Sequence, residues 1–92
     1  MARKKVEKIK VRSEDDIMDA ESGDYCYFLN PSNKVVFAEI KRVFDENGIR
    51  VLQIISQDEF KFMSLPAAIC SFDERSLKGK KRAQLCPEVY SV

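Results

Sequence analysis

The side chains that could do chemistry in this chain are three cysteines and several carboxylates, because the sequence contains no histidine. Histidine is the usual general base near neutral pH and the commonest metal ligand. Cys26, Cys70 and Cys86 are widely spaced and form no Cys-x-x-Cys pair, so we expect no metal site and no cofactor. The apolar neighbours of Cys26 and Cys70 predict small buried side chains, because a nucleophilic thiol needs a group that lowers its pKa.

Adjacent acidic residues at positions 15–16, 45–46 and 58–59 are the remaining candidates for acid–base chemistry. Each pair falls in a segment that predicts a turn or a helix cap, where carboxylates are ordinarily solvated. The sequence shows no nucleophile–base pair, and three glycines are too few for a phosphate-binding glycine-rich loop. We therefore expect no catalytic residue and no enzymatic activity.

Length and composition place the chain among small one-domain globular proteins. It has 92 residues, of which 45% are hydrophobic and 34% charged. No apolar run approaches the roughly 18 residues that cross a bilayer, so we expect no membrane association. The basic N-terminus lacks a following apolar segment and therefore does not predict a secretory signal. The absence of a predicted secretory signal and the odd number of cysteines together favour reduced thiols and a cytoplasmic location.

Charge is segregated along the chain, although the net charge is only +1. Residues 1–12 sum to +5, residues 13–33 to −6 and residues 72–92 to +2, while the segment between them is neutral. Two basic segments that converge on one face would bind an anion such as nucleic acid, whereas the ordinary alternative is solvated surface. The candidate anion-binding residues are Lys4, Lys5, Lys8, Lys10, Arg12, Lys78, Lys80, Lys81 and Arg82.

Alternating apolar residues and recurrent turn signals predict a mainly β protein. Short connections between neighbouring strands favour an antiparallel meander, and curling a five-stranded sheet into a small barrel would bury its inner face. A short helical turn after Ser13, ending by Gly23, would precede the second strand. The expected strands cover residues 9–12, 24–29, 35–44, 49–56 and 60–65, with a 3₁₀ turn and a further short strand at 68–71.

Residues 34–46 are ambiguous between strand and helix. Val36, Phe37, Ile40 and Val43 fit the spacing of one helix face, but apolar residues also alternate here with Glu39 and other polar residues. A strand is favoured because Asn-Gly follows and leads into a β-branched run, as in a hairpin. If this segment is helical instead, the fold becomes an α+β arrangement.

The domain boundaries follow from these elements. The C-terminal part is polar and basic, with a possible edge strand at 83–86 before frayed final residues. We expect a disordered basic N-terminus, a single small β-barrel domain and a basic loop with a C-terminal tail, at residues 1–4, 5–72 and 73–92 respectively.

The segments 23–28 (GDYCYF), 36–40 (VFAEI), 48–51 (GIRV) and 60–66 together resemble an SH3-like barrel of the Tudor or KOW type. The resemblance covers about residues 23–70 and concerns architecture. It implies a five-stranded barrel ending at a short 3₁₀ turn. Tudor domains typically hold a methylated side chain in an aromatic cage, and the aromatic residues that could form such a surface here are Tyr25, Tyr27, Phe37, Phe60 and Phe62.

Two functional hypotheses remain, both for a non-catalytic binding module. The first is a nucleic-acid-binding module in which the basic segments contact phosphates and exposed aromatic rings stack on bases. The second is a protein-interaction or regulatory protein, such as an adaptor, an inhibitor or an accessory protein of a phage or mobile element. Because the chain has no tryptophan, we expect its six Phe and three Tyr chiefly to build the core.

Overall fold

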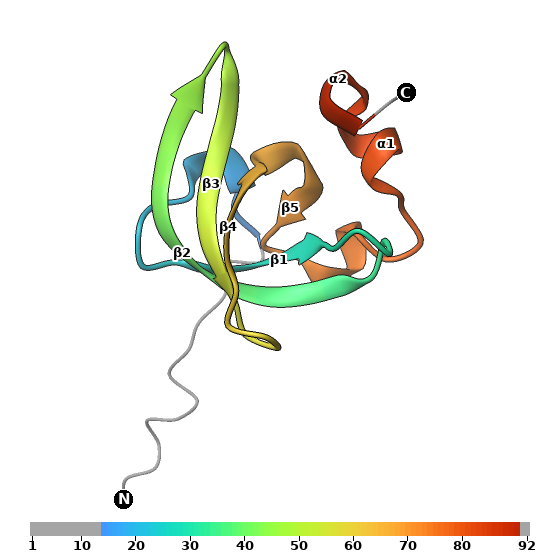
Figure 1. The fold of residues 1–92 in the computed structure, drawn as a ribbon, viewed down its shortest axis with the longest axis horizontal. Coiled ribbons are helices and arrows are strands. Elements are labelled where there is room, and N and C mark those ends of the chain that lie inside the picture. The colour runs from blue at the N-terminus through green and yellow to red at the C-terminus, as the bar shows by residue number, and fades with distance from the viewer. Residues whose placement is uncertain (1–13, 91–92) are drawn as a thin grey trace, which may run out of the picture.

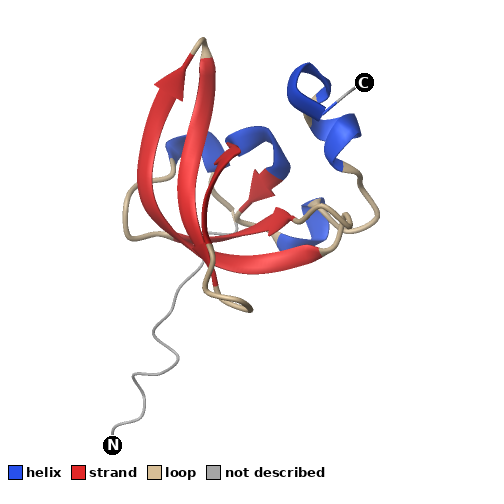
Figure 2. Cartoon of the chain, viewed as in Figure 1, coloured by secondary structure: helices blue, strands red, loops and turns tan. Residues whose placement is uncertain are grey.

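The computed structural model describes residues 14–90 and shows a mainly β fold, built on one five-stranded antiparallel sheet (Figures 1 and 2). The order across the sheet is β4-β3-β2-β1-β5, so the last strand returns to pair with the first. The elements are η2 (Ile17–Asp19), β1 (Tyr25–Leu29), β2 (Val35–Glu46), β3 (Ile49–Ser56), β4 (Phe62–Pro66), η3 (Ala67–Ile69), β5 (Cys70–Ser71), η4 (Glu74–Ser76), α1 (Arg82–Leu85) and α2 (Pro87–Tyr90). The predicted mainly β fold is confirmed, and so is the 3₁₀ turn before the last strand.

The sheet curls strongly but is not closed, so the prediction of a closed barrel is wrong. Its two edges are β4 and β5, and β5 has only two residues, which pair with β1 alone. No hydrogen-bonded ladder therefore joins β5 to β4. The C-terminal segment supplies part of the missing cover, because Cys86 is buried in the core and Leu85 and Tyr90 pack against it.

The longest strands, β2 and β3, form a hairpin whose two-residue loop is Asn47-Gly48. Both loop residues have positive φ, 54° and 80°, which is the conformation that a type I′ turn requires at both positions. Val35–Glu46 is therefore a strand, as the Asn-Gly pair predicted, and the helical alternative for residues 34–46 is wrong. A bulge between Ile40 and Arg42 interrupts the pairing of β2 with β3.

Substituting Gly48 by valine should weaken the hairpin. A β-branched residue at φ 80° is strained, and we expect the free energy of unfolding to fall by about 1–3 kcal/mol. Urea denaturation measures the change. Asn47→Gly is the control, since glycine adopts the same φ freely and should change stability by less than about 0.5 kcal/mol. Equal effects of the two substitutions would contradict the type I′ turn.

The inner face of the sheet forms the core. Side chains alternate along each strand, and those on the concave side are small or aliphatic apart from Phe28. Residues of η3 and the C-terminal segment complete the cluster. The buried core residues are Ala20, Cys26, Phe28, Ala38, Ile40, Leu52, Ile54, Leu65, Ala67, Ile69, Cys70, Phe72 and Cys86.

The short helical elements differ from their predicted positions. The cap of η2 is Asp16, whose carboxylate accepts a hydrogen bond from the Met18 N–H at 3.0 Å, while Ser13 lies outside the described residues. The edge strand predicted at 83–86 is wrong, because residues 83–85 belong to α1 and Cys86 is its C-cap. The Gln84 side chain accepts from the Lys81 N–H at 2.9 Å and so caps the start of that helix.

In the described part of the chain, no helix has the length and apolar composition needed to cross a membrane.

Candidate interaction surface

The outer face of the sheet presents a cluster of aromatic side chains. The register places Tyr25 of β1 opposite Glu39 of β2, Glu39 opposite Ile55 of β3, and Ile55 opposite Phe62 of β4. Facing residues share one side of the sheet, so this row crosses four strands on the outer side. We call this surface the aromatic face; it consists of Tyr25, Tyr27, Phe37, Ile55 and Phe62.

Three rings of the aromatic face are in contact with one another. Phe37 stacks on Tyr25, with ring centroids 5.4 Å apart and planes inclined by 13°. Tyr27, which lies directly opposite Phe37 in the register, contacts it at 5.2 Å with planes inclined by 53°. All three rings are only partly buried, and Phe62 is 61% exposed. Pairing of the rings holds them in place without removing them from solvent.

The expectation that the aromatic residues chiefly build the core is wrong for the five singled out in the sequence. The reason is alternation, because Cys26 and Phe28 of β1 point inward and thereby direct Tyr25 and Tyr27 outward. On β2, the buried Ala38 has the same effect on Phe37. The five aromatic residues therefore lie on the outside of the sheet and not in the core.

Few charges interrupt the aromatic face. Glu39 lies in its central row and forms an ion pair with Lys41, whose Nζ is 3.5 Å from the carboxylate. The pair is partly solvent-exposed and contributes little to stability. A surface rich in aromatic rings and with few charges has a composition typical of the core of a protein interface.

The turn between β3 and β4 adds another exposed ring. Phe60 is 73% exposed and has a φ of 55°, in the left-handed region that costs a side-chain-bearing residue free energy. The turn itself is fixed by Ser56, whose N–H donates to the Lys61 carbonyl and whose Oγ accepts from the Lys61 N–H. The stability of the fold therefore does not explain a phenylalanine at this position, and a role of the ring in binding would explain it.

Replacing Phe60 by glycine should stabilise the fold by about 0.5–1 kcal/mol. The left-handed conformation costs phenylalanine about 1–2 kcal/mol, and the greater backbone freedom of glycine in the unfolded chain offsets part of that gain. Thermal unfolding would measure the change. Phe60→Ala is the matched control, because alanine keeps the Cβ and should give no comparable gain. A loss of stability in the glycine variant would show that the ring is structural.

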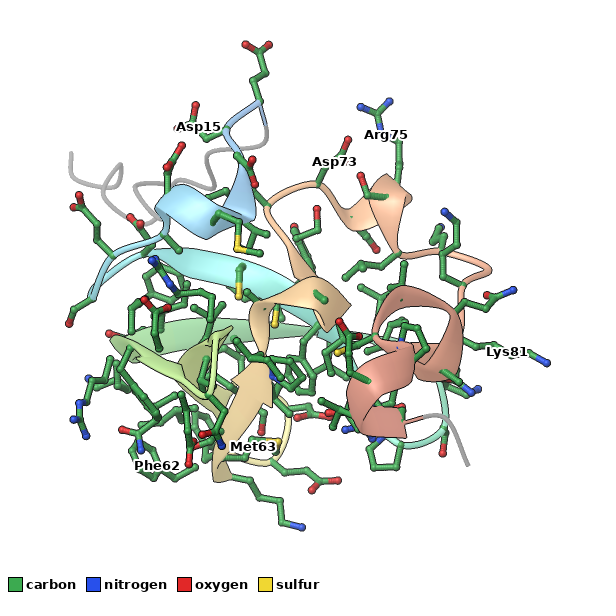
Figure 3. The ribbon with its side chains drawn as sticks, turned by 90° about the horizontal axis from the view of Figure 1, so that it is seen from above. Asp15, Phe62, Met63, Asp73, Arg75 and Lys81 are labelled. Carbon is green, nitrogen blue, oxygen red and sulfur yellow. The ribbon has the colours of Figure 1, made fainter. Side chains whose placement is uncertain are left out.

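Of the basic residues predicted to bind anions, Lys4, Lys5, Lys8, Lys10 and Arg12 lie outside the described residues. Lys78, Lys80 and Lys81 are exposed in the segment between η4 and α1, and no carboxylate among residues 14–90 forms an ion pair with them. In Figure 3, Lys81 projects on one side of the molecule and Phe62 lies on the other. The structure thus does not bring Lys81 onto the aromatic face.

Arg82 does not belong to the exposed basic cluster. Its guanidinium carbon lies 4.2 Å from the centre of the Tyr90 ring, and its Nη2 donates to the Tyr90 hydroxyl at 2.8 Å. Its backbone N–H donates to the Asn33 side chain at 2.9 Å, which ties α1 to the β1–β2 turn. Only three of the four predicted basic residues in this segment therefore face solvent.

The three cysteines are buried free thiols. A hydrogen bond with Cys26 and burial raise the pKa of Cys70, and the nearby charge of Arg82 only partly opposes this effect. Burial also raises the pKa of Cys86. Raised pKa values disfavour the thiolate that nucleophilic or metal-binding cysteines use. Among residues 14–90, no three His, Cys, Asp or Glu side chains gather in a metal-binding cluster.

A groove of about 470 Å³ opens between the β1–β2 turn, the β3–β4 turn and the start of α1. Its apolar wall includes Phe28, Val36 and Leu65 from the inner face of the sheet. Arg82 lines it from α1. The sequence offered no signal for this groove, because its walls come from segments that meet only in the folded chain.

The fold and the aromatic face define a class, a small mainly β protein with an exposed ring-rich surface on one sheet. Comparison with protein-family models, with curated proteins and with solved structures gives no match. Ile55 is the one member of the aromatic face that the sequence analysis did not single out. Counting back from the Asn-Gly turn would have placed Ile55 opposite the buried Ile40, because only the bulge between Ile40 and Arg42 brings Ile55 opposite Glu39.

Proposed function

We propose that this protein is a non-catalytic binding module whose partner is another protein, bound on the aromatic face. The observation that carries the proposal is the set of partly exposed rings on β1, β2 and β4, with Ile55 of β3 among them and one ion pair, Glu39–Lys41, at the centre. Exposed apolar patches of this kind mark interaction surfaces. Tyr and Phe are enriched at interface cores because they bury a large area for few rotatable bonds.

Charge favours a protein over a nucleic acid as the ligand of this face. Residues 14–90 carry fourteen acidic and ten basic residues, a net charge of −4. A phosphate backbone lying over the rings would need several basic side chains beside them. The one lysine of the central ion pair, Lys41, is already neutralised by Glu39. Three free thiols fit a reducing compartment such as the cytoplasm.

Site-specific photocrosslinking tests the proposal. A benzophenone amino acid placed at Tyr27, within the aromatic face, should give a discrete adduct with a protein when cells expressing the chain are irradiated. The matched position is Val89 of α2, which is 47% exposed and lies outside the face. A protein adduct from position 27 and none from position 89 supports the proposal. The same adducts from both positions, or none from position 27, would argue against it.

The second candidate is nucleic-acid binding, favoured by the exposed lysines at 78, 80 and 81, which form no ion pair among residues 14–90, together with the basic N-terminal segment. Fluorescence anisotropy of labelled single- and double-stranded oligonucleotides, at about 50 and 200 mM salt, would detect it. A steep loss of affinity with salt that Lys78→Ala, Lys80→Ala and Lys81→Ala together reduce would support this function. The first proposal predicts no binding at either salt concentration.

A further inference from the structure

The groove beside Arg82 has the dimensions and the lining of a small-molecule site. Its volume of about 470 Å³ lies within the range of ligand pockets. Apolar side chains from the inner sheet face form one wall, and a small number of polar groups converge on the opening, as ligand sites typically show. The lining residues used below are Phe28, Asn30, Ser56, Lys61, Met63 and Arg82.

Arg82 is the polar group in the groove that has no counter-charge among residues 14–90. Within the described part of the chain, no carboxylate forms an ion pair with its guanidinium. The Nε–H is buried without a hydrogen-bond acceptor, and the Tyr90 hydroxyl accepts only from Nη2. The group is therefore partly desolvated and unneutralised, and such a cation gains much from an anion that reaches it.

The other charges of the groove restrict which anion can enter. Asp58 and Glu59 lie at the opening, on the β3–β4 turn, and Lys61 there is paired with Glu59 at 3.8 Å. Two carboxylates at the rim repel phosphates and other multiply charged anions. A single carboxylate that passes them would meet the unpaired guanidinium of Arg82, and the rest of the ligand would meet apolar side chains.

We propose that this groove binds a small organic monocarboxylate, with the carboxylate on Arg82 and an apolar body against the inner face of the sheet. Arg82 would bind the carboxylate by its charge, and the apolar wall formed by Phe28 and its neighbours would contact the apolar body. The site is separate from the function proposed for the aromatic face. Phe62 alone touches both surfaces, and the test below leaves it unchanged.

Octanoate is the probe, with octanamide as a neutral analogue of the same shape, and binding is followed by amide chemical shifts of the isotopically labelled full chain. We expect octanoate to bind with a Kd of about 1 mM, a weak affinity ordinary for so small a ligand. The shifts should map to the amides of Asn30, Ser56, Met63 and Arg82. Octanamide should bind at least about tenfold more weakly, because it cannot form the charge-assisted pair.

Two variants and one control complete the test. Arg82→Met removes the charge but keeps the apolar stem, and Met63→Trp fills the groove with Arg82 intact. Each should weaken octanoate about tenfold or more. Lys78→Met removes an exposed cation that does not line the groove and should change the affinity less than about twofold. Retained dispersion of the amide chemical shifts shows that each variant is folded. If Arg82→Met unfolds, the affinity of Met63→Trp for octanoate tests the proposal instead.

The proposal is overturned if octanoate gives no saturable shifts up to about 20 mM. Equal binding of octanamide would also overturn it, as would full affinity of the folded Arg82→Met variant. Shifts confined to the aromatic face would assign the ligand to the other surface and reject the groove.

Discussion

Substitution of Phe28 by alanine lowers the free energy of unfolding by about 3–5 kcal/mol, the range observed for large aromatic residues removed from a packed core. Phe28 is 2% exposed and lies on β1, the strand between β2 and β5. Its partners across the sheet are Val36 and Cys70. The loss is a large part of the total stability of a domain this small, so the variant should be partly unfolded at ambient temperature.

Tyr27→Ala is the matched control for this substitution. Tyr27 is the neighbouring residue on the same strand, but its ring lies on the aromatic face and is only partly buried. Its removal should cost no more than about 1.5 kcal/mol. Urea denaturation followed by circular dichroism compares the two variants. Equal losses at positions 27 and 28 would contradict the assignment of inner and outer faces.

Substitution of Phe37 by threonine should weaken the binding of the protein partner about 30-fold or more. Phe37 contacts both Tyr25 and Tyr27, so its loss removes the centre of the ring cluster, where interface energy concentrates. Threonine preserves the preference for a strand. The free energy of unfolding should fall by no more than about 1.5 kcal/mol, so a binding defect would not reflect unfolding.

Phe44→Thr is the control for that binding measurement. Phe44 lies on the same strand and is also half-buried, but it sits about 20 Å further along β2, where Arg42 packs over its ring. Surface plasmon resonance with the crosslinked partner, once purified, measures both variants. If Phe44→Thr reduces affinity as much as Phe37→Thr, the interface extends beyond the aromatic face or lies elsewhere.

The hairpin was the most predictable part of the fold, because its determinant is local. Asn47-Gly48 supplies two residues that accept positive φ, and this settled the ambiguity of residues 34–46. The two four-residue C-terminal helices were not predictable, since propensity is weak over such lengths. Packing of Leu85, Cys86 and Tyr90 on the core stabilises them, and no local pattern reports that contact.

The aromatic residues were identified as a candidate site, but their exposure could not be predicted. β1 is apolar on both faces, so alternation alone does not say which side is buried. The choice depends on pairing with β2 and β5 and on which side η3 and the C-terminal segment cover. The groove also depends on long-range contacts, since the hydrogen bonds of Arg82 with Asn33 and Tyr90 hold this residue at the groove wall.

The most direct test of the aromatic face is a quantitative affinity capture from a lysate, with the wild-type chain, the double variant Tyr27→Ser/Phe37→Thr and the control Val89→Ser as baits. Mass spectrometry compares the captured proteins after nuclease treatment. We predict that the wild type and the control enrich the same protein and that the double variant, folded by circular dichroism, loses it. Equal capture by all three baits, or enrichment that nuclease abolishes, would contradict a protein partner on this face.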